Sequence, residues 1–265
     1  MSGLWSSTVL GTTVYLALWF FLVCSFLGVV VECVFFLACD GVLESTTGLL
    51  YLPLRPLYGV GGCAFLVLLR PVVAQPSAVF VLGAVVATVV EYLASLLTDR
   101  TFGAVSWDYS HKSLNLHGRV CLAYSLCWGG LALFAMYVVD RPLRDLLGRL
   151  PQRTGEGLLA ALTVLVLASA VLTLAALART RRRVQALRLA AGDGGAGRAR
   201  SGPSRLLDRL APDPVLLNSF PRMTLLVELG QLTGQRRAWL RVGSRARTGL
   251  VTGEQDVPAR VGGAA

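Results

Sequence analysis

Apolar segments long enough to cross a membrane dominate the chain and constrain its fold more than any other feature. They cover about residues 9–39, 57–69, 77–97, 120–139 and 157–178. A helix rises about 1.5 Å per residue and needs about 20 apolar residues to cross the hydrocarbon core of a bilayer. The second segment barely reaches across and contains three glycines, so we expect it to be tilted, irregular or partly re-entrant. The sequence therefore predicts an all-α, polytopic transmembrane helical bundle of about five spans.

Positive charge is concentrated in the C-terminal part of the chain. Residues 1–178 contain nine Lys and Arg against nine Asp and Glu, whereas residues 179–265 contain sixteen Arg against six acidic residues. The stretch 190–204 is rich in Gly, Ala, Arg and Ser, which is typical of a flexible linker. Residues 205–242 either form an amphipathic surface helix or are disordered. We therefore expect a largely disordered basic C-terminal tail that does not bind nucleic acid.

The arginines also predict the orientation in the membrane. A dense basic cluster directly follows the last apolar segment, and the positive-inside rule places such clusters in the cytoplasm. Five spans then place the N-terminus outside, although a loop expected at 140–156 carries four arginines that favour the opposite orientation. We expect a multi-pass protein of the inner (plasma) membrane with a cytoplasmic C-terminus. Its expected parts are a transmembrane core at 1–142, an additional helix with a basic flank at 143–183, and the tail at 184–265.

Polar residues follow one face of the third apolar segment. On a helix, which turns about 100° per residue, the positions that share this face are Thr88, Glu91, Tyr92, Ser95 and Asp99. A polar face on a spanning helix should contact other helices or a cavity rather than lipid. The first and fourth segments carry comparable faces, at Ser25, Gly28 and Glu32, and at Cys121, Ser125, Trp128, Gly129 and Ala132. We expect these three faces to meet.

Glu32 and Glu91 are carboxyl groups within apolar segments. A charged group inside a bilayer is costly, and such groups often mark a transport path or a substrate site. In one interpretation the two carboxyl groups therefore line a polar pathway. In the other, each is neutral or bonded to a Tyr, Ser or Arg side chain and only fixes helix packing. The sequence leaves both interpretations open.

An aromatic and polar cluster, Trp107, Asp108 and Tyr109, lies between the third and fourth segments. Trp and Tyr are favoured at the membrane interface, so one interpretation is an aromatic anchor. In the other, Asp108 caps the loop or pairs with Arg119, while Asn115 shapes a tight turn against the spans. Both interpretations place the cluster at one mouth of the bundle.

The sequence lacks the common motifs for catalysis and cofactor binding. It contains no G-x-x-x-x-G-K-[ST] phosphate loop, no G-x-S-x-G, no H-E-x-x-H and no dinucleotide fingerprint. Two histidines, His111 and His117, are too few ligands for a metal site. The six cysteines form no C-x-x-C pair and are expected to fill the core. We therefore expect no catalytic residue, no cofactor and no metal.

Spaced motifs run in order from the third to the fourth segment. They are Thr88-x-x-Glu91-Tyr92-x-x-Ser95, Phe102-Gly103, Trp107-Asp108-Tyr109-Ser110, Asn115-x-x-Gly118-Arg119 and Ser125-x-x-Trp128-Gly129. Upstream lies Gly48-x-Leu50-Tyr51-x-Pro53-x-x-Pro56-x-Tyr58-Gly59-x-Gly61. In this order the motifs resemble the CmpB-type membrane proteins, a family labelled type IV ABC-transporter permeases. The resemblance covers about residues 29–142.

This resemblance implies a binding or translocation site and a loop that shapes it. The implied site residues are Glu32, Thr88, Glu91, Tyr92, Ser95, Trp107, Asp108, Tyr109, Asn115 and Arg119. The implied loop-shaping residues are Gly48, Tyr51, Pro53, Pro56, Tyr58, Gly59 and Gly61. The chain departs from the family pattern at Thr47, where the family has an arginine, and at Leu52, where it has a glycine. The missing arginine removes a candidate partner for the two glutamates, and Arg55 or Arg70 could replace it.

The sequence leaves three functions open. The resemblance implies a permease subunit that moves a substrate with the energy of a separate ATP-binding subunit. The alternative is a non-transporting membrane scaffold or sensor, whose tail binds partners or anionic lipid. An intramembrane enzyme that uses the two carboxyl groups is the third, but the chain has no recognised catalytic spacing. The expected partners are the lipid bilayer, the ATP-binding subunit and a second copy of the chain in a homo-oligomer.

Overall fold

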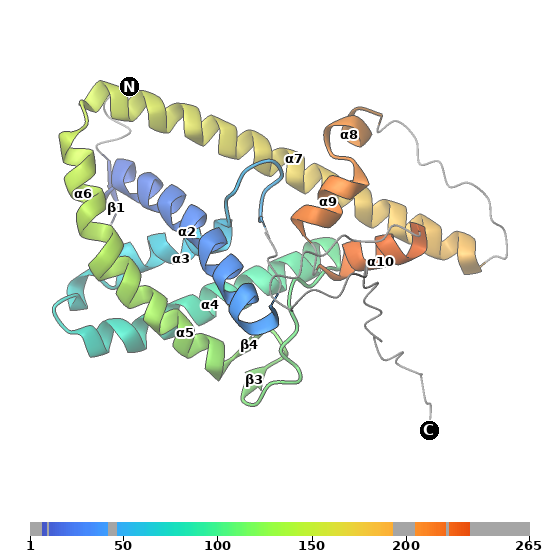
Figure 1. The fold of residues 1–265 in the computed structure, drawn as a ribbon, viewed down its shortest axis with the longest axis horizontal. Helices are drawn as coiled ribbons and strands as arrows, with labels where there is room; N and C mark the ends of the chain where they lie inside the picture. Colours follow the sequence, from blue (N-terminus) through green and yellow to red (C-terminus); the bar gives the residue numbers. More distant parts are fainter. Residues whose placement is uncertain (1–6, 10, 42–46, 193–204, 221–222, 234–265) are drawn as a thin grey trace, which may run out of the picture.

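The fold is a bundle of helices in a computed structural model that describes residues 7–9, 11–41, 47–192, 205–220 and 223–233 (Figure 1). The larger helices are α2 (Val14–Asp40), α3 (Pro56–Leu68), α4 (Pro76–Phe102), α5 (Leu122–Leu133), α6 (Asp140–Arg149) and α7 (Gln152–Gly192). A 3-10 turn, η1 (Arg70–Val72), follows α3, and a π-helical segment, η2 (Phe134–Val139), joins α5 to α6. The short helices are α8 (Arg205–Leu210), α9 (Asp213–Ser219) and α10 (Thr224–Thr233). Two antiparallel pairs of two-residue strands complete the fold, β1 (Thr8–Val9) with β2 (Thr12–Thr13) and β3 (Asn115–Leu116) with β4 (Val120–Cys121).

Within the described residues, four continuous helices are long and apolar enough to cross a membrane. They cover Val14–Cys39, Pro76–Phe102, Leu122–Arg149 and Gln152–Leu189, with mean hydropathies from 1.7 to 2.6. The apolar helix α3 has 13 residues, so it is only about 20 Å long against a hydrocarbon core of about 30 Å. The predicted all-α transmembrane bundle with a short second segment is therefore confirmed.

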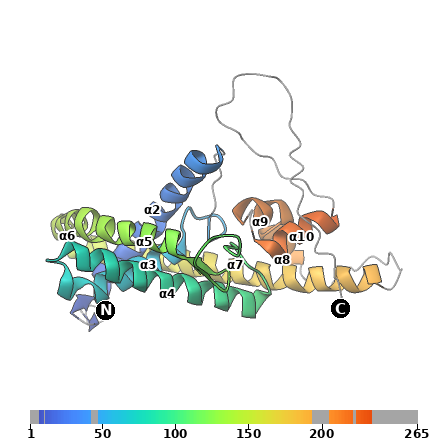
Figure 2. The same cartoon turned by 90° about the horizontal axis from the view of Figure 1, so that it is seen from below.

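The helices alternate in direction, so the bundle has two distinct ends. At what we call the N-terminal end, α2 and α4 begin, and the Tyr137 hydroxyl of η2 donates to the carbonyl of Val73 at 2.6 Å. At the C-terminal end, α2 and α4 finish, α5 begins, and α8–α10 gather on the second half of α7 (Figures 1 and 2). The short α3 begins beside Ser25 and Gly28, near the middle of α2, and returns the chain to the N-terminal end, so the start of α2 and the end of α7 lie at opposite ends.

Local sequence signals set the limits of the spanning helices. The Thr13 side chain caps α2, since its Oγ1 accepts a hydrogen bond from the Leu16 amide at 3.3 Å. Proline begins both α3 and α4, where the missing N–H costs nothing because the first turn has no partner for it. Gly41 and Gly103 end α2 and α4 with φ of 63° and 62°, a left-handed conformation that glycine adopts without strain.

Two predictions from the sequence are wrong. Residues 140–156 do not form a loop, because α5, η2 and α6 run as one continuous helix to Arg149 and α7 begins three residues later. The last apolar helix does not end near residue 178 but continues through the arginine cluster to Gly192. Hydropathy locates the apolar part of a helix, whereas Leu, Ala and Arg all favour helix and extend it beyond the apolar part. The expected boundary between residues 183 and 184 also falls inside α7, so the division into three parts stays a prediction.

Part of the basic tail is helical and packs against α7. The helical alternative is confirmed for 205–210, 213–219 and 224–233. An apolar cluster joins these helices to α7, and its members are Ala176, Leu177, Val184, Ala211, Leu216, Leu217, Met223, Leu225, Leu226 and Leu229. Leu50 and Ala104, from the loops before α3 and after α4, are buried in the same cluster. The rest of the tail, residues 193–204 and 234–265, lies outside the described residues.

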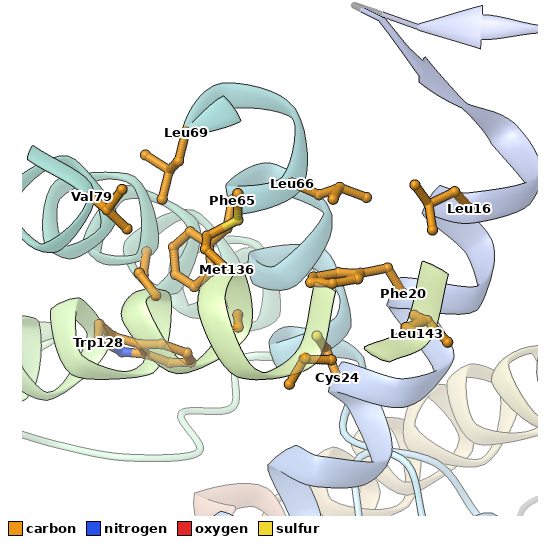
Figure 3. Close-up of a cluster of buried hydrophobic side chains, with 14 residues drawn as sticks. Leu16, Phe20, Cys24, Phe65, Leu66, Leu69, Val79, Trp128, Met136 and Leu143 are labelled. Atoms are coloured by element: carbon orange, nitrogen blue, oxygen red, sulfur yellow. The ribbon is translucent and has the colours of Figure 1, made fainter. Parts of the chain in front are cut away.

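A second apolar core joins the first four large helices (Figure 3). Its buried members include Phe20, Phe65, Val79, Trp128 and Met136. Small residues let α4 and α5 approach closely, as is common between helices in membranes. A Cβ atom at Gly83 would overlap the side chain of Ala132, and one at Gly129 would lie 2.8 Å from the Phe80 carbonyl oxygen.

The cysteines follow their predicted role only in part. Cys24 and Cys121 are buried, and Cys24 belongs to the core of the first four large helices. Cys39 and Cys127 are exposed instead, because they lie on the faces of their helices that point away from the bundle. All six thiols are free.

Two adjacent glycines of α5 allow a matched test of this packing. Gly129→Ala should lower the midpoint of thermal unfolding in detergent, because a methyl group has no room against the Phe80 backbone and overpacking costs about 1–3 kcal/mol. Gly130→Ala is the control, since Gly130 is exposed and nothing lies within 4 Å of a Cβ there. Equal midpoints for the two variants would show that α4 and α5 do not pack in this way.

Candidate functional site

The packing face of α4 changes from apolar to polar along its length. The buried positions recur every four residues, at Val79, Gly83, Ala87, Glu91 and Ser95. The small residues of the first half contact α5, and the polar residues of the second half lie toward the C-terminal end of the bundle. The candidate site is therefore built where this polar half meets α5 and the loop that joins the two helices.

Glu91 is buried at the centre of the site. Only 4% of the Glu91 residue is exposed to solvent. The indole Nε1 of Trp128, on α5, donates a hydrogen bond to Oε2 at 3.0 Å. The hydroxyl of Tyr109, in the loop, donates to Oε1 at 3.3 Å. Both carboxyl oxygens are thus bonded, as a buried acidic group requires.

Tyr109 is suited to the role of a permanent donor. Burial raises the pKa of its hydroxyl strongly, and the neighbouring Glu91 raises it further. The hydroxyl therefore keeps its proton throughout the physiological pH range and remains available to Glu91. The ring of Tyr109 also lies against Tyr124 of α5, with centroids 4.7 Å apart.

Glu32, the second acidic residue, is paired with Arg55 where α2 and α3 meet. The guanidinium of Arg55 forms an ion pair with the Glu32 carboxylate, and both side chains are less than one-fifth exposed. The Arg55 amide donates to the carbonyl of Ser25 at 2.9 Å, which fixes the start of α3 against α2. Of the two arginines considered as substitutes for the family's missing one, Arg55 is thus a partner of Glu32.

Tyr58 links the two glutamates across the bundle. Its hydroxyl forms a side-chain hydrogen bond with Glu32, and its ring lies 4.9 Å, centroid to centroid, from the ring of Trp128. A Cβ at Gly28 would overlap the Tyr58 ring, so the glycine of α2 makes the space that the ring occupies. We call the connected set Glu32, Arg55, Tyr58, Trp128, Glu91 and Tyr109 the carboxylate network.

The rest of the polar face of α4 is bonded to α5 and to the loop at 103–121. Thr88 donates to Ser125 Oγ at 2.7 Å, and the Tyr92 hydroxyl lies 3.1 Å from Nδ1 of His117. The guanidinium of Arg119 donates to Ser95 at 3.1 Å and forms an ion pair with Asp99 at 2.6 Å. The predicted polar faces of α4 and α5 therefore do meet, whereas the predicted face of α2 packs against α3 and reaches them through the ring of Tyr58.

The loop at 103–121 is held by its own polar side chains. Asp108 accepts from the amide and the hydroxyl of Ser110, at 2.9 and 2.5 Å. Asn115 donates to the Lys112 carbonyl at 2.8 Å and accepts from the amide of Gly118 at 3.0 Å. Gly118 has φ of +67°, and a Cβ there would overlap the Ser110 hydroxyl, so a glycine is needed at this position. These bonds favour the tight-loop interpretation over a simple aromatic anchor.

Trp107 connects this loop back to the arginine. Its Nε1 donates to the carbonyl of Arg119 at 2.8 Å, across the two sides of the loop. The bond holds the Arg119 backbone while the guanidinium reaches α4. Trp107 therefore positions Arg119 rather than either of the two glutamates.

The loop before α3 places Arg55. The Gly48 amide donates to the Leu54 carbonyl at 2.9 Å, and a Cβ at Gly48 would lie 2.6 Å from Cδ of Pro56. Tyr51 has φ of 63° and donates its hydroxyl to the Leu210 carbonyl at 2.7 Å. A Cβ at Gly59 would overlap Ser25 and Phe21, whereas nothing lies within 4 Å of one at Gly61. Gly48 and Gly59 thus have a steric reason for being glycine that Gly61 lacks. Pro53 lies in the stretch without helix or strand between Leu52 and the start of α3.

Three residues matter more in the structure than the sequence indicated. Trp128 lay on a predicted helix face but was not a predicted site residue, and Arg55 entered only as one of two substitutes. Tyr58 was expected to shape a loop, yet it joins the two halves of the network. A guanidinium or polar ring within one turn of the start of α3 is the signal that would have identified Arg55 and Tyr58, whereas Trp128 lies in the second turn of α5 and only its polar helix face pointed to it. Among the described residues, no group of three or more His, Cys, Asp or Glu side chains converges to hold a metal ion.

A double-mutant cycle tests the Glu32–Arg55 pair. Arg55→Gln should destabilise the protein by about 3 kcal/mol, because it leaves a largely buried carboxylate without its partner. Glu32→Gln should do the same for the guanidinium, while the double variant should lose less than the sum of the two. Unfolding in detergent, followed by circular dichroism, measures all four proteins. Strictly additive losses would show that the two side chains do not interact.

Comparison with known proteins places the chain in a family. No curated protein and no solved structure matches it. The family described as "Putative ABC-transporter type IV" matches residues 19–174, which is more than half of the chain. This range includes the whole carboxylate network, the helices α3, α4 and α5, and all but the first five residues of α2. The chain is an integral membrane protein and belongs to this ABC-transporter-type family.

Proposed function

We propose that the protein is the membrane subunit of a transport system and moves a substrate across the bilayer with energy from a separate ATP-binding subunit. Family membership and four membrane-spanning helices support a transporter-related role. The observation that carries the proposal is the buried Glu91, which is bonded to Trp128 and Tyr109 inside the bundle. A buried acidic residue with its partners is a frequent mark of a transport path.

In this proposal the carboxylate network acts as a gate. It lies at the C-terminal end of the bundle, where side chains of α2, α3, α4 and α5 converge with one loop. Every member of the network is bonded to another member, so the arrangement is the closed form. A substrate that passes this end must separate Trp128 or Tyr109 from Glu91, or Arg55 from Glu32. The gate therefore opens by exchanging internal bonds for bonds to the substrate or to water.

The proposed orientation places the gate on the cytoplasmic side of the inner membrane. The C-terminal end holds the basic part of α7, with Arg179, Arg181, Arg182, Arg183 and Arg188. Such a cluster beside a span favours the cytoplasm. The arginines of α6, at the opposite end, are fewer, namely Arg141, Arg144 and Arg149. An ATP-binding subunit would then meet the end of the bundle that carries the gate.

The alternative, a non-transporting scaffold or sensor, is favoured by one observation. Every member of the network is bonded to another member, although Arg55 Nε is buried without a partner, and α8–α10 add a second packed cluster at the same end. Both features fit a rigid assembly whose polar residues only hold the helices together. The exposed apolar faces of α4 and α7, which include Val85, Leu93, Val164 and Val171, accept lipid in either proposal and would also accept a second copy of the chain.

Substituting Glu91 separates the two functions. The tagged full chain is purified from native membranes with any associated ATP-binding subunit, placed in nanodiscs and assayed for ATP hydrolysis and for thermal unfolding. Under the transport proposal, Glu91→Gln reduces hydrolysis about tenfold or more while the protein stays folded, because coupling depends on the gate. Asp145→Asn, at an exposed carboxylate of α6, is the matched control and should leave hydrolysis unchanged.

Two outcomes would contradict the transport proposal. Wild-type hydrolysis by the Glu91→Gln complex would show that the gate is not coupled to ATP. A preparation that contains no hydrolytic activity at all, combined with a lower unfolding temperature for Glu91→Gln, would support the scaffold.

A further inference from the structure

The helices α8–α10 are attached to the loops that hold the carboxylate network. The amide of Val105 donates to Thr224 Oγ1 and the Val105 carbonyl accepts from the amide of Thr224, both at 3.0 Å. Val105 lies three residues after the end of α4 and two before Trp107. Ala104, its neighbour, is fully buried in the cluster that joins the tail to α7. The first residues of the loop at 103–121 are therefore fixed by α10.

The loop before α3 is fixed in the same way. The Tyr51 hydroxyl donates to the Leu210 carbonyl of α8 at 2.7 Å. Leu50, fully buried, donates its amide to Thr173 of α7 at 3.0 Å and accepts from Ser169 at 2.5 Å. This loop ends at Arg55, the partner of Glu32. Both loops that supply residues to the network are thus clamped by α7 and the tail helices.

Ion pairs attach the tail helices to the basic end of α7. Arg179 is paired with Asp208 at 2.6 Å and with Asp213 at 3.3 Å, and its side chain is 8% exposed. Arg183 is also paired with Asp213, and Arg188 with Glu228. The side chains of Arg183 and Arg188 are 36% and 63% exposed, so other anions can reach them.

These arginines begin directly after the apolar part of α7. Arg179 follows Ala178, where the apolar run of α7 ends within the helix, so in this proposal the arginines begin at the level of the lipid headgroups. Basic residues at this level attract anionic lipids, and exposed ion pairs are weak. A phosphate group can therefore take the place that Asp213 or Glu228 holds in the docked form.

We propose that α8–α10 form a clamp on the carboxylate network, and that anionic phospholipid headgroups release it by competing with Asp208, Asp213 and Glu228 for the arginines of α7. Release frees Val105 and Tyr51, and the two loops that position Tyr109, Arg119 and Arg55 become mobile. This inference concerns regulation of the proposed gate and rests on that function, but the clamp itself can be measured without any transport.

Hydrogen exchange of the full chain in nanodiscs tests the clamp. Peptides that contain Val105 and α10 should exchange about tenfold faster in phosphatidylcholine with phosphatidylglycerol than in phosphatidylcholine alone, because the headgroups attract each arginine at the surface. Peptides from the middle of α3 serve as an internal reference and should not change. Asp213→Asn should exchange fast in both lipids, because Arg179 and Arg183 lose their shared partner. Glu228→Gln, at the exposed pair, gives the same comparison if Asp213→Asn does not fold.

The matched control is Asp140→Asn, which removes a comparable ion pair with Arg144 at the other end of the bundle and should behave as wild type. Equal exchange of Val105 in the two lipid compositions would overturn the proposal. The proposal would also be overturned if the Val105 peptide exchanged slowly in neutral lipid in both single variants, Asp213→Asn and Glu228→Gln, because the acidic residues would then not hold the clamp. If free inorganic phosphate raised the exchange rate of the Val105 peptide equally in neutral nanodiscs, the claim that the anion comes from the membrane would be overturned. Because no transport is measured, a failed clamp and a failed gate give different results.

Discussion

A carboxyl group buried in a membrane-spanning helix must be bonded by other parts of the protein, and at Glu91 this requirement organises the whole bundle. Its two donors, Trp128 and Tyr109, come from α5 and from the loop that precedes it. Trp128 can reach Glu91 only because Gly83 and Gly129 let α4 and α5 approach closely. The loop, in turn, depends on Gly118 and on bonds among its own polar residues. Packing and polar bonding thus support each other, as expected where lipid offers no alternative partner.

The same arrangement explains why the candidate site lies toward one end of the molecule. Glu32 lies at the start of the last third of α2 and Glu91 just past the middle of α4, and their partners on α3 and α5 lie in the first two turns of those helices. Both connecting loops are held there by α7 and the tail helices, through Leu50 and Val105. A change in the tail can therefore reach Arg55 and Tyr109 through one loop each. This short mechanical path links the basic, membrane-adjacent part of the chain to the acidic residues inside the bundle.

Helical periodicity was enough to predict the polar face of α4 and its meeting with α5, because the residues from Thr88 to Asp99 lie on one uninterrupted helix. It did not show that α3 lies between the polar face of α2 and this site. Periodicity could not choose between Arg55 and Arg70 as the partner of Glu32, since that choice depends on how the loop before α3 folds back onto Ser25. The contact between Tyr58 and Trp128 joins residues 70 positions apart and has no local signal. The ends of α6 and α7 were missed because hydropathy detects apolar residues, whereas Arg-rich and Leu-rich helices continue past them.

The most direct test of the central claim is the coupling energy between Glu91 and Trp128. It is obtained from unfolding of Glu91→Gln, Trp128→Phe and the double variant in detergent. Phe keeps most of the ring packing and removes the Nε1 donor, so the cycle isolates the hydrogen bond. We expect the double variant to be more stable than the sum of the single losses predicts, by about 1 kcal/mol or more, as for hydrogen bonds to acidic groups. Additive losses would contradict the claim that this bond ties α4 to α5 and closes the gate.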